Sequence, residues 1–148
     1  MRLRVEPVVS AWFGCRCCRA REHLARVSGD FSDLVVWRES AALAASVIRR
    51  CRGLRGVGAA NATDQMVRAA ESIPANIAEG VGRGVTRDCV RFLRMARASA
   101  AELESHLRVA SLAGRLASSD ADTLVDHVRR VRYLLDRFLK SVEARYRA

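Results

Sequence analysis

The sequence predicts an all-α protein, an antiparallel up-down-up-down four-helix bundle that follows an N-terminal extension. Alanine, leucine and arginine, which are strong helix formers, dominate the composition. From residue 31 onward, apolar residues recur at the three- and four-residue spacings of an amphipathic helix, and no strand-like alternation competes with this pattern. Four such segments are joined by short loops, which make neighbouring helices antiparallel.

The size and charge of the chain limit the class of protein. With 148 residues, half of them apolar, it suits one domain with a core of its own. No apolar run reaches about 18 residues, so we expect no membrane span. The net charge of +10 comes almost entirely from arginine, which favours bidentate contacts with phosphate. A GC-rich genome would produce the same preference for arginine over lysine.

The cysteines indicate a reducing environment. The chain has five, an odd number, and no clean signal peptide precedes them, so we expect a cytoplasmic protein rather than a secreted disulfide scaffold. The CRCC segment at 15–18 lacks the paired C-x-x-C spacing of a zinc site. Cys51 and Cys89 fall in line with other apolar residues and are expected in the core. The sequence therefore predicts no metal site and no cofactor.

A domain boundary is predicted next to residue 30. Residues 1–30 have no sustained period and end in SGD, a turn signal. We expect them to form a poorly ordered extension, or to lie upstream of the true start codon. Residues 31–148 should form the bundle.

The first helix follows Asp33. Gly53 and Gly56, in the segment RGLRGVG, should end it. Its predicted inner row consists of Leu34, Trp37, Ala41, Ala44, Ile48 and Cys51.

The second helix starts near Thr63 or Asn61, either of which can cap it. Glycines at 80, 82 and 84 should close it. Its predicted inner row consists of Met66, Ala70, Ile73 and Ile77.

The third and fourth helices have the longest apolar rows. Thr86 can cap the third and Gly114 can end it, and the segment SSD at 118–120 can cap the fourth. The predicted inner rows are Cys89, Leu93, Ala96, Ala100, Leu103, Leu107 and Ala110 in the third helix, and Leu124, Val128, Val131, Leu135, Phe138 and Val142 in the fourth.

Pro74 lies inside the second helix, in the segment SIPANIAEGVGRG. Proline lacks a backbone donor, so the carbonyl of Ala70 should lose its partner and the helix should bend. Ser72 and Asn76 are close enough in sequence to satisfy local backbone groups. Gly80 is one of three glycines that allow a sharp turn or the close approach of another backbone.

Four segments of the chain resemble one known family. FSDLVVWRES, AAESIPANIAEGVGRG, RDCVRFLRMARASAAELESHL and the closing helix are similar, in this order, to the bacterial four-helix-bundle proteins encoded in 23S rRNA intervening sequences. These in turn are similar to the accessory variability protein of diversity-generating retroelements. The resemblance covers about residues 31 to 145, in line with a single bundle domain.

The resemblance implies a four-helix bundle that assembles as a ring-shaped homopentamer. It also implies a basic surface, which binds nucleic acid in the retroelement relatives, and it implies no enzyme. The N-terminal extension and a glycine-rich, lysine-poor first loop depart from the family pattern.

Two basic faces are candidates for binding nucleic acid. At 100° per residue, the arginines around the start of the third helix fall on one side, opposite its inner row. A second cluster lies opposite the inner row of the fourth helix and has a tyrosine in its middle, which suits phosphate contact combined with base stacking. The candidates are Arg83, Arg87, Arg91 and Arg94 for the first face, and Arg129, Arg130, Tyr133, Arg137, Lys140 and Arg147 for the second.

Other interpretations of these charges stay open. Arginines on an amphipathic helix are also typical of a solvated outer face. The protein would then be an oligomeric scaffold that binds a protein partner, such as a reverse transcriptase or an RNA-processing factor. Met95, Val90 and Leu134 project off the inner rows, and apolar residues outside a monomer core indicate a homo-oligomer, for which the resemblance suggests five protomers.

A further set of residues is assigned a structural role. We expect Asn76, Glu79 and Glu102 to hold helices or protomers together, with Arg91 or Arg83 as partners, because partly buried charges are normally paired. Ser72, Pro74 and Gly80 complete this motif. Glu102 and His106 alone are too few ligands for the metal site of a bundle enzyme. No recognisable nucleophile motif or phosphate loop occurs, so we expect no catalysis.

Overall fold

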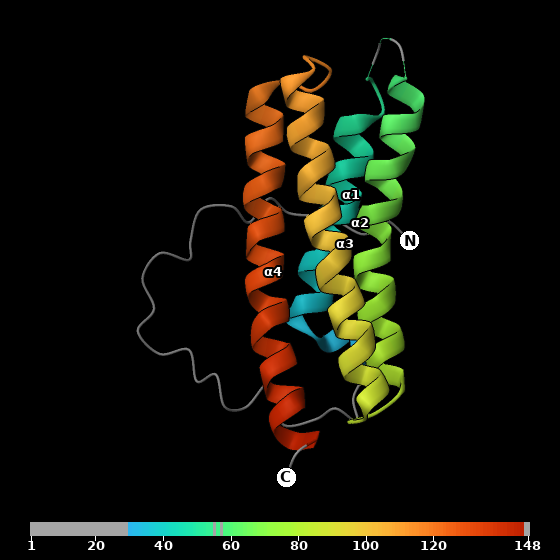
Figure 1. The fold of residues 1–148 in the computed structure, drawn as a ribbon, viewed down its shortest axis with the longest axis vertical. Coiled ribbons are helices and arrows are strands. Elements are labelled where there is room, and N and C mark those ends of the chain that lie inside the picture. The colour runs from blue at the N-terminus through green and yellow to red at the C-terminus, as the bar shows by residue number, and fades with distance from the viewer. Residues whose placement is uncertain (1–29, 55, 57, 147–148) are drawn as a thin grey trace, which may run out of the picture.

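The structure is a computed structural model that describes residues 30–54, 56 and 58–146. A short 3-10 helix, η1 (Phe31–Asp33), precedes α1 (Val35–Cys51), α2 (Ala59–Gly82), α3 (Arg87–Leu112) and α4 (Ser118–Tyr146). Figure 1 shows the four long helices side by side, with successive helices running in opposite directions. The predicted all-α four-helix bundle is confirmed.

Residues 1–29 of the N-terminal extension, which include the CRCC segment, lie outside the described residues. Arg147 also lies outside them. The boundary at residue 30 therefore stays a prediction. None of the described helices combines the length and the apolar character that crossing a membrane requires.

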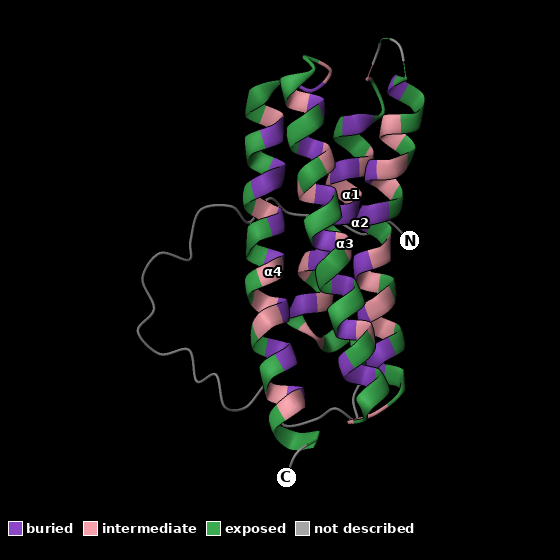
Figure 2. Cartoon of the chain, in the orientation of Figure 1, coloured by how far each residue is buried: buried purple, intermediate pink, exposed green. Residues whose placement is uncertain are grey.

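The core matches the rows predicted for three of the helices. Every residue of the predicted inner rows of α2, α3 and α4 is buried. The purple bands in Figure 2 mark these rows along the inner side of each helix. Apolar residues, mainly leucine and alanine, recur every three or four residues and give each of these helices one apolar side. The sequence therefore predicts which side of each helix faces the core.

Four of the six residues predicted for the inner row of α1 are not buried. Leu34, Trp37, Ala41 and Ile48 are only partly buried, although Ala44 and Cys51 are buried as predicted. The residues that face the core are Val36, Ser40, Leu43, Ala44, Val47 and Cys51.

The core row of α1 includes one polar residue, Ser40, which a search for apolar spacing passes over. The Ser40 hydroxyl donates a hydrogen bond to the Trp37 carbonyl at 2.7 Å, so this polar side chain is buried without an unsatisfied group. Trp37 is large and stays at the edge of the core, where it packs edge-on against Phe31.

Two of the three apolar residues that were expected to lie outside the monomer core contribute to it instead. Val90 is only 8% exposed and belongs to the core. Leu134 is partly buried and packs against the core. Met95 is exposed, as predicted. Val90 adjoins Cys89 of the inner row, and a pattern taken from one helix does not show how far its neighbours extend the core.

The predicted start is confirmed for α3 and wrong for α2, and α4 begins at Ser118, the first residue of the segment SSD. Thr86 caps α3 by accepting a hydrogen bond from the backbone N–H of Cys89 at 3.2 Å, as predicted. The predicted caps of α2 are wrong, because this helix begins earlier, at Ala59 after Gly58. The Thr63 hydroxyl instead donates to the carbonyl of Cys51 at the end of α1.

Helix α2 continues through Pro74, and neighbouring polar groups contact its backbone. The Asn76 amide donates to both the carbonyl and the hydroxyl of Ser72, at 2.8 and 2.9 Å. The Ser72 hydroxyl also contacts the Ser99 hydroxyl of α3 at 2.9 Å. These two residues of the motif therefore link α2 to α3.

Gly80 lies at a close contact between α2 and α3. A β-carbon at this position would lie 3.1 Å from Cβ of Phe92 and 3.3 Å from the backbone oxygen of Cys89. Only glycine allows this approach without a shift of α3. The glycine-rich end of the second helix therefore contains one packing glycine, Gly80, and one turn glycine, Gly84, whose φ is +66°.

Candidate nucleic-acid interface

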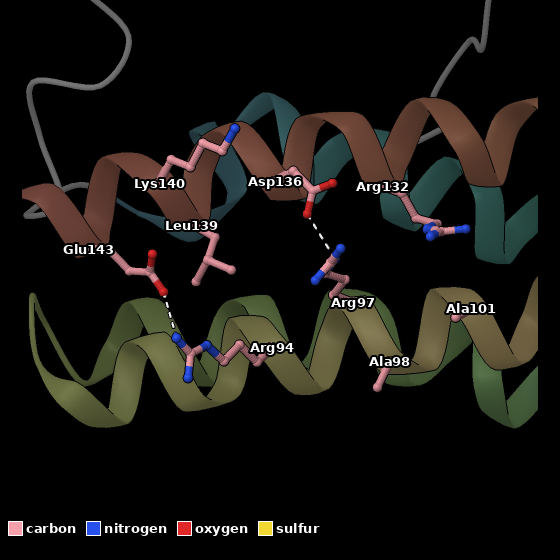
Figure 3. A pocket seen from close by; sticks show the side chains of 9 residues that line it. All are labelled: Arg94, Arg97, Ala98, Ala101, Arg132, Asp136, Leu139, Lys140 and Glu143. Atoms are coloured by element: carbon pink, nitrogen blue, oxygen red, sulfur yellow. Dashed lines mark hydrogen bonds and ion pairs between the residues drawn. The ribbon is translucent and has the colours of Figure 1, made fainter.

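A groove runs along the surface between α3 and α4 and has a volume of about 710 Å³. We call it the α3–α4 groove. It is lined by Arg94, Arg97, Ala98 and Ala101 of α3 and by Arg132, Asp136, Leu139, Lys140 and Glu143 of α4. Small alanines on α3 leave the space, and long charged side chains from both helices surround it (Figure 3).

A second hollow of about 330 Å³ adjoins the groove toward the start of α3. Arg94 and Glu143 line both, so the two spaces meet at this pair. Arg87, Val90 and Tyr146 complete the lining of the second space, which we call the Tyr146 hollow. Tyr146 is 52% exposed, and its ring is therefore open to a ligand.

Two ion pairs connect the walls of the groove. The Arg94 guanidinium lies 2.8 Å from Glu143, and the Arg97 guanidinium lies 2.8 Å from Asp136. Figure 3 shows both pairs reaching from α3 to α4. The arginines are half or more exposed, so these pairs contribute little stability and can exchange a carboxylate for a phosphate.

Glu104 organises the arginines at the far end of the groove. Its carboxylate accepts hydrogen bonds from Arg108 at 2.7 Å and from Arg132 at 2.8 Å, and Arg129 approaches to 3.9 Å. Its side chain is only 14% exposed. The hydrogen bond from Arg108, reinforced by that from Arg132, lowers the pKa of this carboxyl although partial burial opposes the change. Glu104 therefore stays ionised and holds the Arg132 side chain at the groove.

The lining of the groove and the hollow has an excess of positive charge. Five of the lining residues are cations, and two, Asp136 and Glu143, are carboxylates. Within the described part of the chain, Arg87 and Lys140 form no ion pair with a carboxylate. These two cations are available to an anionic ligand without losing an internal partner.

Of the first predicted basic face, only Arg87 and Arg94 line this site. Arg83 is the C-cap of α2 rather than a residue of α3, and it pairs with Glu79 one turn earlier. Arg91 lies beside Asp88, at 3.9 Å. The guanidinium carbons of Arg83 and Arg91 lie 5.7 and 4.9 Å from the ring centroid of Phe92, which lies between α2 and α3.

Of the second predicted face, only Lys140 lines the groove. Arg129 pairs with Asp126 at 3.1 Å, and Arg130 pairs with Glu39 of α1 at 3.1 Å. The Arg137 guanidinium lies over the Tyr133 ring, 5.8 Å from its centroid. We call these four residues, Arg129, Arg130, Tyr133 and Arg137, the outer α4 face.

The structural role assigned to the motif stays a prediction, and the contacts of its glutamates within one chain are local. In the single chain, Glu79 pairs with Arg83 and Glu102 contacts His106 at 3.7 Å, so neither joins two of the long helices. Glu104 is the least exposed of the carboxylates that link α3 to α4, and the sequence did not single it out. Within the described residues, no group of three or more histidine, cysteine or acidic side chains is placed to hold a metal ion.

Sequence reasoning also missed Arg97, Arg132 and Tyr146. Arg97 and Arg132 lie on the flanks of their helices, next to the apolar row, rather than opposite it. Flanking arginines at matching heights on two antiparallel neighbours are the signal that could have identified the groove.

Comparison with known proteins agrees with the resemblance. The family model described as "23S rRNA-intervening sequence protein" matches residues 32–137. The chain belongs to this family. A search of curated proteins found no match to this chain.

One solved structure supports the fold of this intervening-sequence protein. It is the crystal structure of a protein with unknown function from the S23 ribosomal protein family of Bacteroides thetaiotaomicron. The two chains are 22% identical, the match covers 72% of this chain and 99% of the other, and the TM-score is 0.63. At this identity the likeness shows a shared fold.

Proposed function

We propose that this intervening-sequence protein binds nucleic acid through the α3–α4 groove and the Tyr146 hollow. The observation that carries the proposal is the gathering of five cations, Arg87, Arg94, Arg97, Arg132 and Lys140, on one hollowed surface with only two carboxylates. Arginine binds phosphate in a bidentate manner, and each phosphate contact releases counterions. The proposal includes no catalytic step.

The distribution of charge over the helices supports this surface. Within Arg87–Leu112, α3 has five arginines and three acidic residues. Within Ala59–Gly82, α2 has one arginine and three acidic residues. Helix α3 is therefore more basic than its neighbour α2, and its arginines can attract an anionic polymer to the groove that they line.

A binding assay with a salt series tests the proposal. We expect labelled RNA and DNA to bind the purified protein with an affinity that falls steeply as salt increases. Substituting Arg87, Arg94 and Lys140 together by glutamine should weaken binding at least tenfold and flatten the salt dependence. The matched control replaces Arg129, Arg130 and Arg137 of the outer α4 face by glutamine, which removes the same charge from another surface. No binding at low salt, or an equal loss in both triple variants, would contradict the assignment.

We also propose that the protein assembles, with a homopentamer as the first expectation from the family resemblance. Val109 and Leu112 of α3 are exposed together with Met95, and exposed apolar residues on one helix favour an interface with another chain. The same side chains favour the alternative function, a scaffold for a protein partner. That alternative predicts assembly without affinity for nucleic acid.

The cytoplasm is the proposed location. The two described cysteines, Cys51 and Cys89, are buried free thiols, and burial raises the pKa of both. Such thiols are compatible with a reducing compartment.

A further inference from the structure

We infer that the ligand of the α3–α4 groove is a single-stranded segment of nucleic acid, with one base stacked on Tyr146. This inference rests on the proposed function and specifies the form of its ligand. It depends on the shape of the groove and on the aromatic ring at one end of it.

The shape of the site favours a single strand over a duplex. The axes of packed helices lie about 8–10 Å apart, so a groove between two neighbours is narrower than a double helix, whose major groove alone is about 12 Å wide. A duplex could touch only the rim of the groove. A single strand can place its phosphates between the two walls.

The length of the site matches a short strand. From Arg87 to Ala101 the groove and hollow follow α3 for 14 residues, a rise of about 21 Å. At about 3.4 Å per phosphate in a stacked strand, this distance covers about six nucleotides, and fewer if the strand is extended. Arg87, Arg94 and Arg97 are spaced along this length and can contact several phosphates of one strand.

Tyr146 provides the contact that only an unpaired base can use. Its ring is half exposed and lies in the same hollow as Arg87 and Arg94, so a stacked base would be next to cations that hold its phosphates. Stacking on an aromatic side chain requires an exposed base face, which a duplex offers only at its ends. The ring of Tyr133 is also exposed, but it lies on the outer α4 face, and Arg137 covers part of it.

The test measures fluorescence anisotropy with a labelled 12-nucleotide single strand, as RNA and as DNA, and with the blunt duplex of the same sequence. We expect the single strands to bind at least tenfold more tightly than the duplex. Tyr146→Ala should weaken single-strand binding by about 5- to 150-fold, the range that base–aromatic stacking spans, and leave duplex binding unchanged. Tyr146→Phe should retain the wild-type affinity, since the phenyl ring also stacks.

Tyr133→Ala is the matched control, because it removes an exposed tyrosine from the same helix outside the groove. Equal or tighter duplex binding would overturn the inference, and so would a loss of affinity in Tyr133→Ala but not in Tyr146→Ala. Either result leaves the proposed function intact if the triple substitution of Arg87, Arg94 and Lys140 still weakens binding. If no nucleic acid binds even at low salt, the proposed function and this inference both fail.

Discussion

At the scale of single residues, Gly80 makes the most specific prediction about packing. Gly80→Ala would place a β-carbon 3.1 Å from Cβ of Phe92 and 3.3 Å from a backbone oxygen of α3, so the two helices must separate. Overpacking of this kind costs about 1–3 kcal/mol, and the higher helix propensity of alanine offsets up to about 1 kcal/mol of it. We expect a net loss of about 1–2 kcal/mol in the free energy of unfolding, measured by urea denaturation.

Gly82→Ala is the control for this substitution. A β-carbon at Gly82 would have no atom within 4 Å, and the residue is still within α2. The control should be neutral or slightly stabilising. If both variants lost the same stability, close packing at Gly80 would not be the cause.

Glu104 makes the corresponding prediction about charge. Glu104→Gln removes the carboxylate that Arg108 and Arg132 share, and it should lower the free energy of unfolding at pH 7 by about 1–3 kcal/mol. Glu102→Gln, at an exposed site on the same helix, should change it by less than about 0.5 kcal/mol. Equal effects of the two substitutions would mean that the bridge between α3 and α4 is not stabilising.

The pH dependence of this effect follows from the lowered pKa of Glu104. Its folded pKa lies below the ordinary value of 4.5, so its contribution to stability is fully present above pH 4.5. The contribution is lost as the pH falls through the folded pKa. The difference in stability between wild type and Glu104→Gln should therefore shrink in acid, which denaturation at a series of pH values would measure.

At the scale of elements, the outer side of α3 divides into two halves with different chemistry. Arg87, Arg91 and Arg94 occupy the first half, whereas Val109 and Leu112 are exposed in the second. Helix α3 therefore exposes more arginines near its start and two large apolar side chains near its end. Binding of nucleic acid and contact with another chain can then use different parts of the same helix.

The contact between α1 and α4 predicts how stability varies near neutral pH. His127 of α4 lies 3.5 Å from Glu39 of α1, and Arg130 lies 3.1 Å from the same carboxylate. Burial lowers the pKa of His127 below its ordinary 6.5, although the charge of Glu39 opposes this change. The unfolded chain therefore binds more protons, and stability should fall as the pH decreases through about 6.5.

Replacing this histidine tests that prediction. His127→Gln should flatten the dependence of the free energy of unfolding on pH between about 7.5 and 5.5, because the variant has no imidazole to protonate in the unfolded state. The measurement is a urea titration at each pH. A slope as steep as that of wild type would assign the pH dependence to other groups.

At the scale of the whole molecule, the sequence predicted the bundle better than it predicted the groove. The rows of α2, α3 and α4 were predictable because each helix has one apolar side. The core row of α1 was missed in part because it includes the polar residue Ser40, whose hydroxyl is satisfied by the Trp37 carbonyl. Arg97 and Arg132 meet only when α3 and α4 pair, so a wheel drawn for a single helix could not bring them together.

Assembly is the last prediction at this scale. Leu112 is 89% exposed, so replacing it changes the stability of the single chain very little. An effect of the double variant Val109→Glu and Leu112→Glu therefore reports on contacts between chains. We expect wild type to sediment at several times the 16.3 kDa of one chain, and the double variant to sediment at a lower mass with unchanged helical circular dichroism. Ala60→Glu with Ala75→Glu adds the same charge to exposed positions of α2 and should leave the mass unchanged. A monomeric wild type at micromolar concentration would disprove assembly, and an unchanged mass in the α3 variant would move the interface to another face of the bundle.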